Sequence, residues 1–511
     1  MTSIALRRER STVVSLTHSF HLLDGVTALI FAAIIALIIA FPLTVSHDAA
    51  LFLDTGNLIL NGKQPYADFD EINFPLVMYV HAVPDAIARV LGVNPIPVFS
   101  VMVLVLAIGS VWGIRCILER RFEGAAPVSW RMIPVFIAFY TLFLFLTERY
   151  GQREHLFILL FLPFFFLRWE RWQGGNVNLR WTVLVGVMGA VGAALKPHFL
   201  PIALAPEAYW IASALLTRHW KQIRNALFAP EMLGFVGTGL VYAAVLLIVP
   251  VFRQAIFDSI LPYVTSSYAD YGIGVTPLTL LTRLDTMLMW LALLVTLPAF
   301  IRNRPLVRPL WLLTFAAILV FCWQGKGWYY HRIPAIFGIG MLLAVVLFER
   351  SERRLLEPIF KVLLVILGYF VITLGGVIQM SDHYPAIRSA ILTHSRPNDP
   401  VMFISSSVDP AYPLLVQTGR RSADRNLTGF PIGVDSADDH DLANYLASLS
   451  QSIASKHPPI ILIDANATCY GCSAGYDMQQ YLQQTGFIDQ NIAPGYVDAG
   501  RVDHFELYLP K

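Results

Sequence analysis

Long apolar runs dominate the chain as far as about residue 380. A helix needs about 20 mostly apolar residues to cross a bilayer, and we find about eleven stretches that meet or approach this length. They lie near residues 26–45, 96–118, 132–147, 155–168, 182–195, 199–216, 231–252, 286–301, 309–323, 334–348 and 359–380. The pattern predicts an α-helical polytopic membrane protein. Its long continuous apolar runs do not fit a membrane β-barrel, whose strands alternate.

The stretch 74–92 is ambiguous, because it is moderately apolar but contains His81, Asp85 and Arg89. Basic residues in short loops collect on the cytoplasmic side of a membrane. If 74–92 lies on the membrane surface, every basic loop falls on one side. These loops contain Arg7 to Arg10, Arg120 and Arg121, Arg168 to Arg180, Arg218 to Arg224, Arg302 to Arg308 and Arg350 to Arg354. We therefore expect a surface helix at 74–92 and a cytoplasmic N-terminus. The first apolar run is too long for a signal peptide and no A-x-A site follows it, which favours an uncleaved anchor.

The pattern changes after residue 380. Apolar runs shrink to strand length at 401–405, 459–464 and 504–509, while 441–455 and 477–485 have a helical pattern. We expect two domains, a membrane domain over 1–380 and a small soluble α/β domain over 381–511. The first outer loop, 46–95, would carry the short juxtamembrane helices. The charge bias places this loop and the C-terminal domain outside the cytoplasm.

Charge is scarce and balanced. Only 14% of the residues are charged, against about 25% in a soluble protein, which excludes a cytosolic enzyme. The 37 basic and 35 acidic residues give a net charge of +2, so a nucleic-acid partner is not expected.

Two of the four cysteines form a C-x-x-C motif in the expected outer domain. Cys469 and Cys472 are disulfide candidates, because thiols outside the cytosol are usually oxidised. A zinc site would need two further ligands. Cys116 and Cys322 lie in or near apolar runs and are expected to pack there.

Four polar segments lie at the expected outer ends of the spans. They are Asp48 after the first span, Glu148 to His155, Lys196 to His198, and Gln324 to Arg332. Each has a structural explanation: a helix cap, a solvated loop, a snorkelling lysine or an aromatic belt. Together, however, they place one carboxylate and several cations at one membrane face. Cations can hold a phosphate, and a carboxylate can act as a base. We therefore expect a lipid-linked phosphate as the substrate.

At these residues the chain resembles the GT-C superfamily of integral-membrane glycosyltransferases, which includes the lipid A aminoarabinose transferase, protein O-mannosyltransferases and polyprenyl-phosphate-mannose-dependent mannosyltransferases. The resemblance rests on an ordered set of features over about residues 20–380. They are Asp48 after the first span, the segment Leu58 to Asp68 with Gly62, Pro65 and Tyr66, then Pro75-Leu76-x-x-Tyr79, the turn Gly92-Val-Asn94, and Gly192-Ala-Ala-Leu195-Lys196-Pro197.

The resemblance implies a GT-C-like fold and an inverting sugar transfer from a polyprenyl-phosphate donor to a hydroxyl of a glycan, lipid or protein acceptor, with Asp48 as the general base. The enzyme would be a hexosyl- or pentosyltransferase of the inner (plasma) membrane, acting at its periplasmic face. The candidates for binding the donor phosphate are Lys196, Arg153, Lys326, His331, Arg332 and His198. The candidates for binding sugar or acceptor are Asp68, Asp70, Glu71, Tyr66, Gln152, Glu154, Trp328 and Tyr329.

No cofactor and no protein metal ligand is assigned. Many members have an Asp-Glu pair after the first span, where this chain has His47-Asp48. A divalent cation therefore stays an open question.

Two other functions compete with this one. A multi-span transporter would favour repeated halves and ionisable groups near the bilayer midplane, whereas the polar segments here lie at span ends and no repeat is evident. A polysaccharide polymerase or ligase with a polyprenyl-diphosphate donor would also act at the outer face. The early Asp48 followed by a surface helix favours the monophosphate donor.

Overall fold

A computed structural model describes residues 23–121, 128–175, 181–265, 281–302, 306–347, 384–405, 407–427, 439–465 and 478–511. Its contacts divide the chain into two compact units made of non-consecutive segments. We call them the bundle unit (Met1–Phe41, Val101–Ala243 and Pro277–Gln379) and the sheet unit (Pro42–Ser100, Ala244–Thr276 and Met380–Lys511). The candidate disulfide Cys469–Cys472 and the expected span 359–380 lie outside the described residues.

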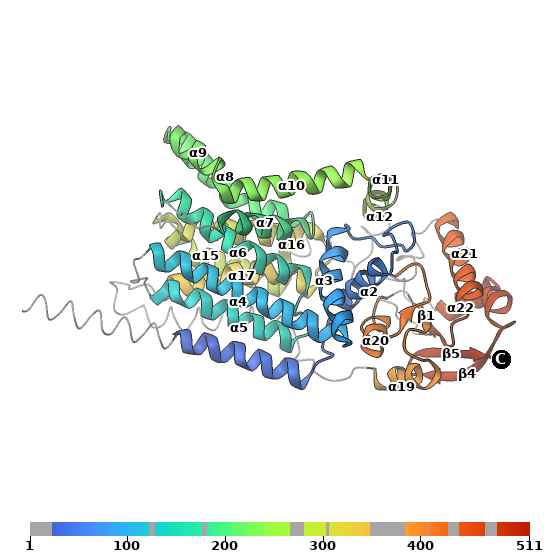
Figure 1. Cartoon of the computed structure of the whole chain (residues 1–511). Helices are drawn as coiled ribbons and strands as arrows, with labels where there is room; N and C mark the ends of the chain where they lie inside the picture. The colour runs from blue at the N-terminus through green and yellow to red at the C-terminus, as the bar shows by residue number, and fades with distance from the viewer. Residues whose placement is uncertain are drawn as a thin grey trace, which may run out of the picture. The chain divides into compact units, whose positions relative to one another are not determined.

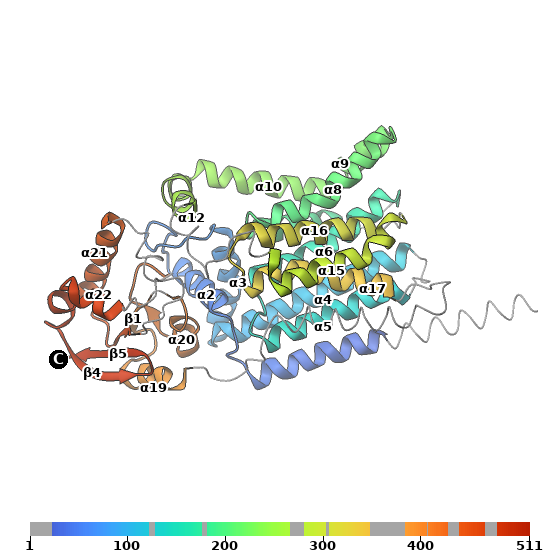
Figure 2. The same cartoon turned by 180° about the vertical axis from the view of Figure 1, so that it is seen from behind.

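The bundle unit consists of long helices that lie side by side (Figure 1, Figure 2). Because these helices are apolar, their side chains pack against one another in the interior of the bundle. α6 is almost wholly buried, with Phe157, Phe161, Phe165 and Trp169 in the core. α6 packs on α7, and α16 packs on α8 and α17. The helices are α4 (Pro95–Arg121), α5 (Val128–Leu146), α6 (Arg153–Trp172), α7 (Thr182–Ala194), α8 (Phe199–Leu216), α9 (Trp220–Leu227), α10 (Pro230–Ile248), α15 (Leu284–Ile301), α16 (Val307–Gln324) and α17 (Ile333–Leu347).

Seven helices of the described chain are long and apolar enough to cross a membrane, which agrees with the expected polytopic fold. They are Leu23–Ala40, Pro95–Arg121, Phe199–Leu216, Pro230–Ile248, Leu284–Ile301, Val307–Gln324 and Tyr329–Val346. Trp130–Leu146 and Thr182–Ala194 are apolar but shorter. The expected span 231–252 ends early, at Ile248, because Pro250 cannot continue the helical hydrogen bonding.

One expected loop residue is part of the bundle core. The sequence predicts a basic loop that begins at Arg168, but α6 continues to Trp172 and buries Arg168 completely. Its partners Glu207 and Glu231 lie in α8 and α10, within stretches that read as apolar spans. Buried ion pairing therefore extends this helix beyond the expected residue 168.

In the sheet unit, α2 (His47–Leu60) packs against α3 (Leu76–Leu91). A Cβ at Gly56 would lie 2.7 Å from the backbone nitrogen of Ala82, so only glycine allows this approach. α3 is the stretch expected to lie on the membrane surface. It ends at Gly92, whose φ of 67° favours glycine.

The rest of the sheet unit contains a mixed five-stranded sheet of order β2-β1-β3-β5-β4. β1 is parallel to β2 and β3, and β5 is antiparallel to β3 and β4. The three expected strands appear as β1, β3 and β5. The bounds are β1 (Pro400–Ile404), β2 (Arg421–Ser422), β3 (Ile461–Asp464), β4 (Tyr496–Val502), β5 (Phe505–Pro510), α19 (Pro385–His394), α20 (Ala411–Thr418), α21 (Asp439–Lys456) and α22 (Met478–Gln484). Residues of α21 and α22 cover the apolar side chains of β1 and β3.

Polar contacts join the early loop to the C-terminal segment inside the sheet unit. The Tyr412 hydroxyl donates to Asp54 Oδ2 at 2.6 Å, and Asn94 Nδ2 donates to the carbonyl of Val416 at 2.8 Å. Residues distant in the sequence therefore form one unit. A short segment, α11 (Pro250–Gln254), η1 (Ala255–Ile260) and α12 (Leu261–Thr265), packs against Tyr66 and Phe74 in the same unit.

Candidate active site

A lysine, a glutamate and a histidine from three parts of the bundle unit meet at the N-terminal end of α6. Lys196 Nζ lies 3.1 Å from Glu154 Oε1 and 2.9 Å from His331 Nε2. α6 and α7 run antiparallel, so Lys196 after α7 returns to the start of α6. A Cβ at Gly192 would lie 3.2 Å from the carbonyl oxygen of Phe157, so this glycine lets the two helices come close enough. The close packing of α6 and α7 therefore explains the glycine in the sequence motif around Lys196.

These three side chains are buried: Lys196 is 9% exposed, Glu154 0% and His331 4%. Within the described chain, Glu154 Oε2 and His331 Nδ1 are buried without a hydrogen-bond partner. A buried polar atom left unsatisfied costs about 1–3 kcal/mol. The pattern is typical of a place that receives a ligand or water.

A second group of charges surrounds Asp285 at the start of α15. Arg332 Nη1 donates to Asp285 Oδ2 at 2.7 Å, and Arg283 Nη2 donates to the same oxygen at 3.0 Å. The guanidinium groups of Arg332 and Arg149 lie 4.6 and 4.8 Å from the centre of the Tyr329 ring. Burial and the nearby charge of Arg332 lower the pKa of Arg149 to about 10.

Among the described residues of this region, buried cations outnumber buried acids. Arg153, Lys196, Lys326 and Arg332 are all under 10% exposed, while the buried acids are Glu154 and Asp285. His331 Nε2 lies 3.9 Å from Glu154 Oε1, and Arg153 and Arg332 are the chain neighbours of Glu154 and His331. Lys326 lies five residues before His331. We call these six residues, with His331, the cationic cluster. Buried positive charge is unfavourable unless negative charge balances it, so a cluster in which the described cations exceed the described acids suits an anion.

The other predicted residues of the bundle unit surround this cluster. Gln152 is 2% exposed at the start of α6, and the Trp328 ring lies 5.2 Å from the His331 ring. His198 precedes α8, and its Nδ1 is buried without a partner within the described residues. Burial and the charges of Lys196 and Arg153 lower the pKa of His198 to about 4, so the ring is neutral at pH 7.

Asp48 lies in the sheet unit, in the first turn of α2. Ser46, not Asp48, caps this helix, because its hydroxyl accepts from the backbone nitrogen of Ala49 at 3.3 Å. Asp48 Oδ1 lies 3.4 Å from His47 Nε2, and its side chain is 14% exposed. Its Oδ2 is buried without a hydrogen-bond partner in the described residues. The capping explanation for Asp48 is therefore wrong, and one carboxylate oxygen is left to accept a proton.

The predicted acceptor-binding residues of the early loop all have contacts that hold the loop itself. Asp68 accepts from the backbone nitrogen of Gln64 at 2.7 Å, and Asp70 pairs with Arg425 at 3.1 Å. The side chain of Glu71 accepts from Asn73, and the Tyr66 hydroxyl donates to the Asn73 carbonyl. These contacts account for the residue types without a substrate.

Three polar residues with buried or charged partners in the structure are not among the candidates predicted from the sequence: Asp285, Asp54 and Tyr412. Asp285 binds two arginines of the bundle unit. The only indication of this in the sequence is an acidic residue two positions after Arg283, at the start of an apolar run. Asp54 is 4% exposed and pairs with Tyr412. Asp54 and Tyr412 are 358 residues apart in the sequence, so no local pattern could predict their contact.

Metal ligands do not converge in the described part of the chain, where no group of three or more His, Cys, Asp or Glu side chains could hold an ion. The described residues therefore assign no ligand set to a divalent cation.

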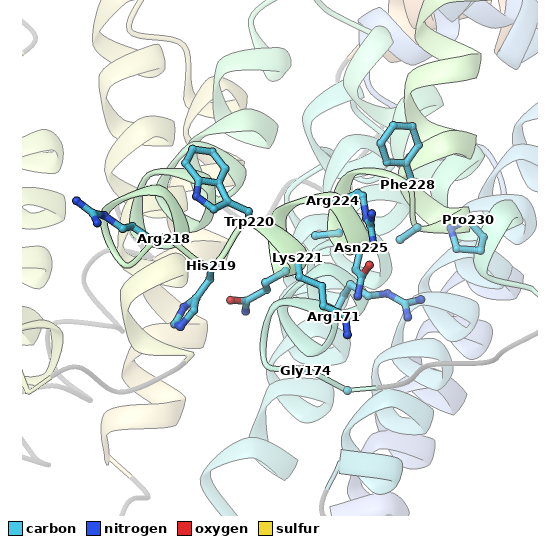
Figure 3. A pocket seen from close by; sticks show the side chains of 14 residues that line it. Arg171, Gly174, Arg218, His219, Trp220, Lys221, Arg224, Asn225, Phe228 and Pro230 are labelled. Carbon is cyan, nitrogen blue, oxygen red and sulfur yellow. The ribbon is translucent and has the colours of Figure 1, made fainter.

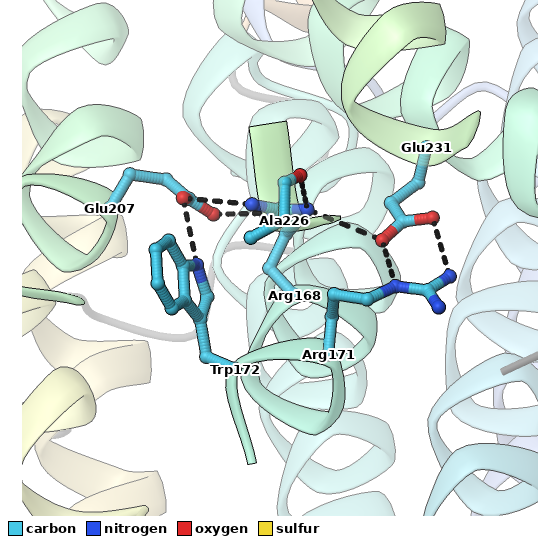
Figure 4. Close-up of polar contacts among 6 residues, drawn as sticks. All are labelled: Arg168, Arg171, Trp172, Glu207, Ala226 and Glu231. Carbon is cyan, nitrogen blue, oxygen red and sulfur yellow. Dashed lines mark hydrogen bonds and ion pairs between the residues drawn. The ribbon is translucent and has the colours of Figure 1, made fainter. Parts of the chain in front are cut away.

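The other end of α6 carries a charge network of a different kind. Arg168 binds Glu207 through two hydrogen bonds of 2.6 and 3.0 Å, and Arg171 binds Glu231 through two of 2.9 and 3.1 Å (Figure 4). Trp172 Nε1 also donates to Glu207 at 3.0 Å. In this group two arginines face two glutamates, so the charges are balanced and most polar atoms are satisfied. It explains stability rather than ligand binding.

The fold is that of a GT-C-like membrane protein with a small C-terminal sheet. It is similar to the crystal structure of ArnT from Cupriavidus metallidurans bound to undecaprenyl phosphate, with a TM-score of 0.58 and 12% identity over 95% of this chain and 97% of that one. The apo structure of the same protein gives a TM-score of 0.53 and 13% identity over 94% and 97%. This confirms the expected fold class. No family model matches the sequence, and no curated protein does.

Proposed function

We propose that this protein is a membrane glycosyltransferase that takes a sugar from a polyprenyl-phosphate donor. The observation that carries the proposal is the cationic cluster, in which four buried cations and two buried acids of the described chain gather in a fold similar to that of ArnT. The ArnT structure binds undecaprenyl phosphate, a lipid whose phosphate is the kind of anion that such a cluster would balance.

The chemistry follows from the charges. The bond between the anomeric carbon and the phosphate oxygen breaks, and the lipid phosphate leaves with its electron pair. Lys196, Arg153, Lys326 and Arg332 stabilise the negative charge that develops on the leaving group. Glu154 holds Lys196 at 3.1 Å, which fixes the direction of its ammonium group. Glu154 is thus a positioning residue in this proposal.

The acceptor is a hydroxyl group, and Asp48 takes its proton as the oxygen attacks the anomeric carbon from the opposite face. The configuration at that carbon is inverted. A positioned base contributes about 10²–10⁴-fold to such a step. Asp48 Oδ2 has no hydrogen-bond partner among the described residues, which supports this role because an acceptor hydroxyl needs a free carboxylate oxygen.

The basic loops support an orientation with the N-terminus in the cytoplasm and the reaction at the outer face of the plasma membrane. In this arrangement the membrane domain, 1–380, performs the transfer, and the segment 381–511 lies outside. Whether a hexose or a pentose is transferred is decided by the donor, so the test uses both.

The test measures sugar transfer from polyprenyl-phosphate hexose and pentose donors by the purified full chain, with Asp48→Asn and a matched control, Asp54→Asn, on the same helix. Asp48→Asn should lower transfer by about 10²–10⁴-fold and leave donor retention unchanged, because only the base is lost. Asp54→Asn should keep transfer within a few-fold of wild type. Equal activity of wild type and Asp48→Asn would contradict the role of Asp48. Failure of the wild type to bind any polyprenyl phosphate would overturn the proposed function itself.

A further inference from the structure

A basic pocket lies in the bundle unit, at the junction between α8 and α9. It has a volume of about 1060 Å³ and is lined by five basic side chains (Figure 3). They are Arg171, Arg218, His219, Lys221 and Arg224. The lining also includes Trp220 and Phe228, and none of the described residues that line it is acidic.

Most of this positive charge is not neutralised. Arg171 pairs with Glu231, but Arg218, Lys221 and Arg224 form no ion pair with any described residue. The charges are therefore available to an anion from outside the protein. Guanidinium and ammonium groups gathered in a concave site suit a phosphate.

Hydrogen bonds to α6 hold the pocket in place. Arg168 Nη1 donates to the carbonyl of Ala226 at 2.8 Å, and Gln222 Nε2 donates to the carbonyl of Trp172 at 2.6 Å. Both bonds connect α9 to the buried end of α6. The cations of α9 are therefore held in position by α6, because they lie on a helix that is hydrogen-bonded to it.

The position of α9 places the pocket at the surface of a membrane. The candidate span Phe199–Leu216 ends just before α9, and the candidate span Pro230–Ile248 begins just after it. Trp220 is 63% exposed and Phe228 70% exposed at the two ends of this helix. An exposed amphipathic helix with tryptophan and cations lies in the interfacial layer, where its apolar residues reach the acyl chains.

We propose that this pocket binds the headgroup of an anionic phospholipid. The cations would bind the headgroup phosphate, and Trp220 and Phe228 would contact the start of the acyl chains. A soluble phosphate would use only the cations and would leave the two aromatic side chains idle. This combination favours a lipid.

The pocket is separate from the cationic cluster. Glu154 and Arg171 stand at opposite ends of α6, and at 1.5 Å per residue they are about 26 Å apart along the helix. This separation approaches the thickness of about 30 Å of the hydrocarbon core of a bilayer, so in our proposal the two sites face opposite leaflets. The proposal does not depend on the proposed glycosyltransferase activity.

The test measures lipid binding to the purified full chain by native mass spectrometry with phosphatidylglycerol. The variant Lys221→Gln/Arg224→Gln removes two pocket cations. The control Arg120→Gln/Arg302→Gln removes two exposed cations outside the pocket lining, one in the last turn of α4 and one directly after α15. The pocket variant should bind about 30-fold more weakly, which corresponds to about 2 kcal/mol, and the control should bind within threefold of wild type.

Other outcomes would overturn the proposal. Equal losses in both variants would mean diffuse surface attraction without a site. Unchanged binding by the pocket variant would mean that its cations serve only orientation in the membrane. Glycerol 3-phosphate bound as tightly as phosphatidylglycerol would remove the lipid assignment, because the aromatic residues would then contribute nothing. Trp220→Ala, which keeps every cation, should weaken lipid binding without changing glycerol 3-phosphate binding.

Discussion

The two ends of α6 both bury charged side chains, but they do so in opposite ways. At its C-terminal end Arg168 and Arg171 face Glu207 and Glu231, with two hydrogen bonds in each main pair. At its N-terminal end four buried cations face two acids, and polar atoms of Glu154 and His331 remain unsatisfied in the described chain. At the C-terminal end each described arginine pairs with a glutamate, whereas at the N-terminal end the described cations exceed the acids, which is the basis of the proposed phosphate site. The same helix therefore shows how burial alone does not identify a functional site.

The balanced end should break first when its charge is changed. Arg168→Ala would leave Glu207 and part of Glu231 buried without their partner, and such a loss costs about 3–5 kcal/mol. We expect a large fall in the thermal midpoint of the full chain in detergent. Arg168→Ala/Glu207→Leu should recover much of it, because the double change removes the orphaned charge. A midpoint for Arg168→Ala equal to that of wild type would contradict the structural role.

The sequence predicted the fold class and the strands well, because apolar periodicity and run length depend on neighbouring residues. It could not predict the Arg168 network, whose members lie 39 and 63 residues apart and read as a basic loop and two apolar spans. From the sequence, Lys196 and His331 are predicted to bind phosphate and Glu154 to bind sugar or acceptor, with no indication that the three meet. Their meeting depends on how α6, α7 and α17 pack, which no local pattern encodes.

Asp54 in the sheet unit sharpens the comparison, because this buried acid pairs with none of the buried cations that the structure describes. Burial raises the pKa of Asp54 to about 6, against the opposing hydrogen bond from Tyr412. The neutral form is favoured in the folded state, so its contribution to stability is complete below about pH 4 and is lost as the pH rises through 6.

Asp54→Asn cannot ionise, so its stability should not show this loss. Wild type and variant should unfold at similar temperatures at about pH 3.5, below the unfolded-state pKa. At pH 7 the variant should be more stable by up to about 3 kcal/mol. Thermal unfolding of the full chain at several pH values checks this. The same pH dependence in both proteins would show that Asp54 does not titrate near pH 6.

Arg332 offers a smaller test at the unbalanced end. Asp285 lies 2.7 Å from its guanidinium and already offsets part of its charge. Arg332→Gln should therefore weaken binding of a polyprenyl phosphate by only about threefold to tenfold. Arg332→Lys, which keeps the charge, should recover most of the affinity. Equal affinities for the glutamine and lysine variants would show that the charge at this position does not act on the lipid.

The central claim is that the excess charge of the cationic cluster binds the donor phosphate. The most direct measurement is the affinity of the purified protein for a polyprenyl phosphate, by native mass spectrometry, in wild type, Lys196→Gln and the control Arg302→Gln. Glutamine can still hydrogen-bond to Glu154, so the fold should survive, and a thermal midpoint verifies this. We expect Lys196→Gln to bind about tenfold to hundredfold more weakly, since a hydrogen bond to a charged group contributes about 1.5–3 kcal/mol. Arg302→Gln should bind like wild type. A folded Lys196→Gln variant with wild-type affinity would contradict the account.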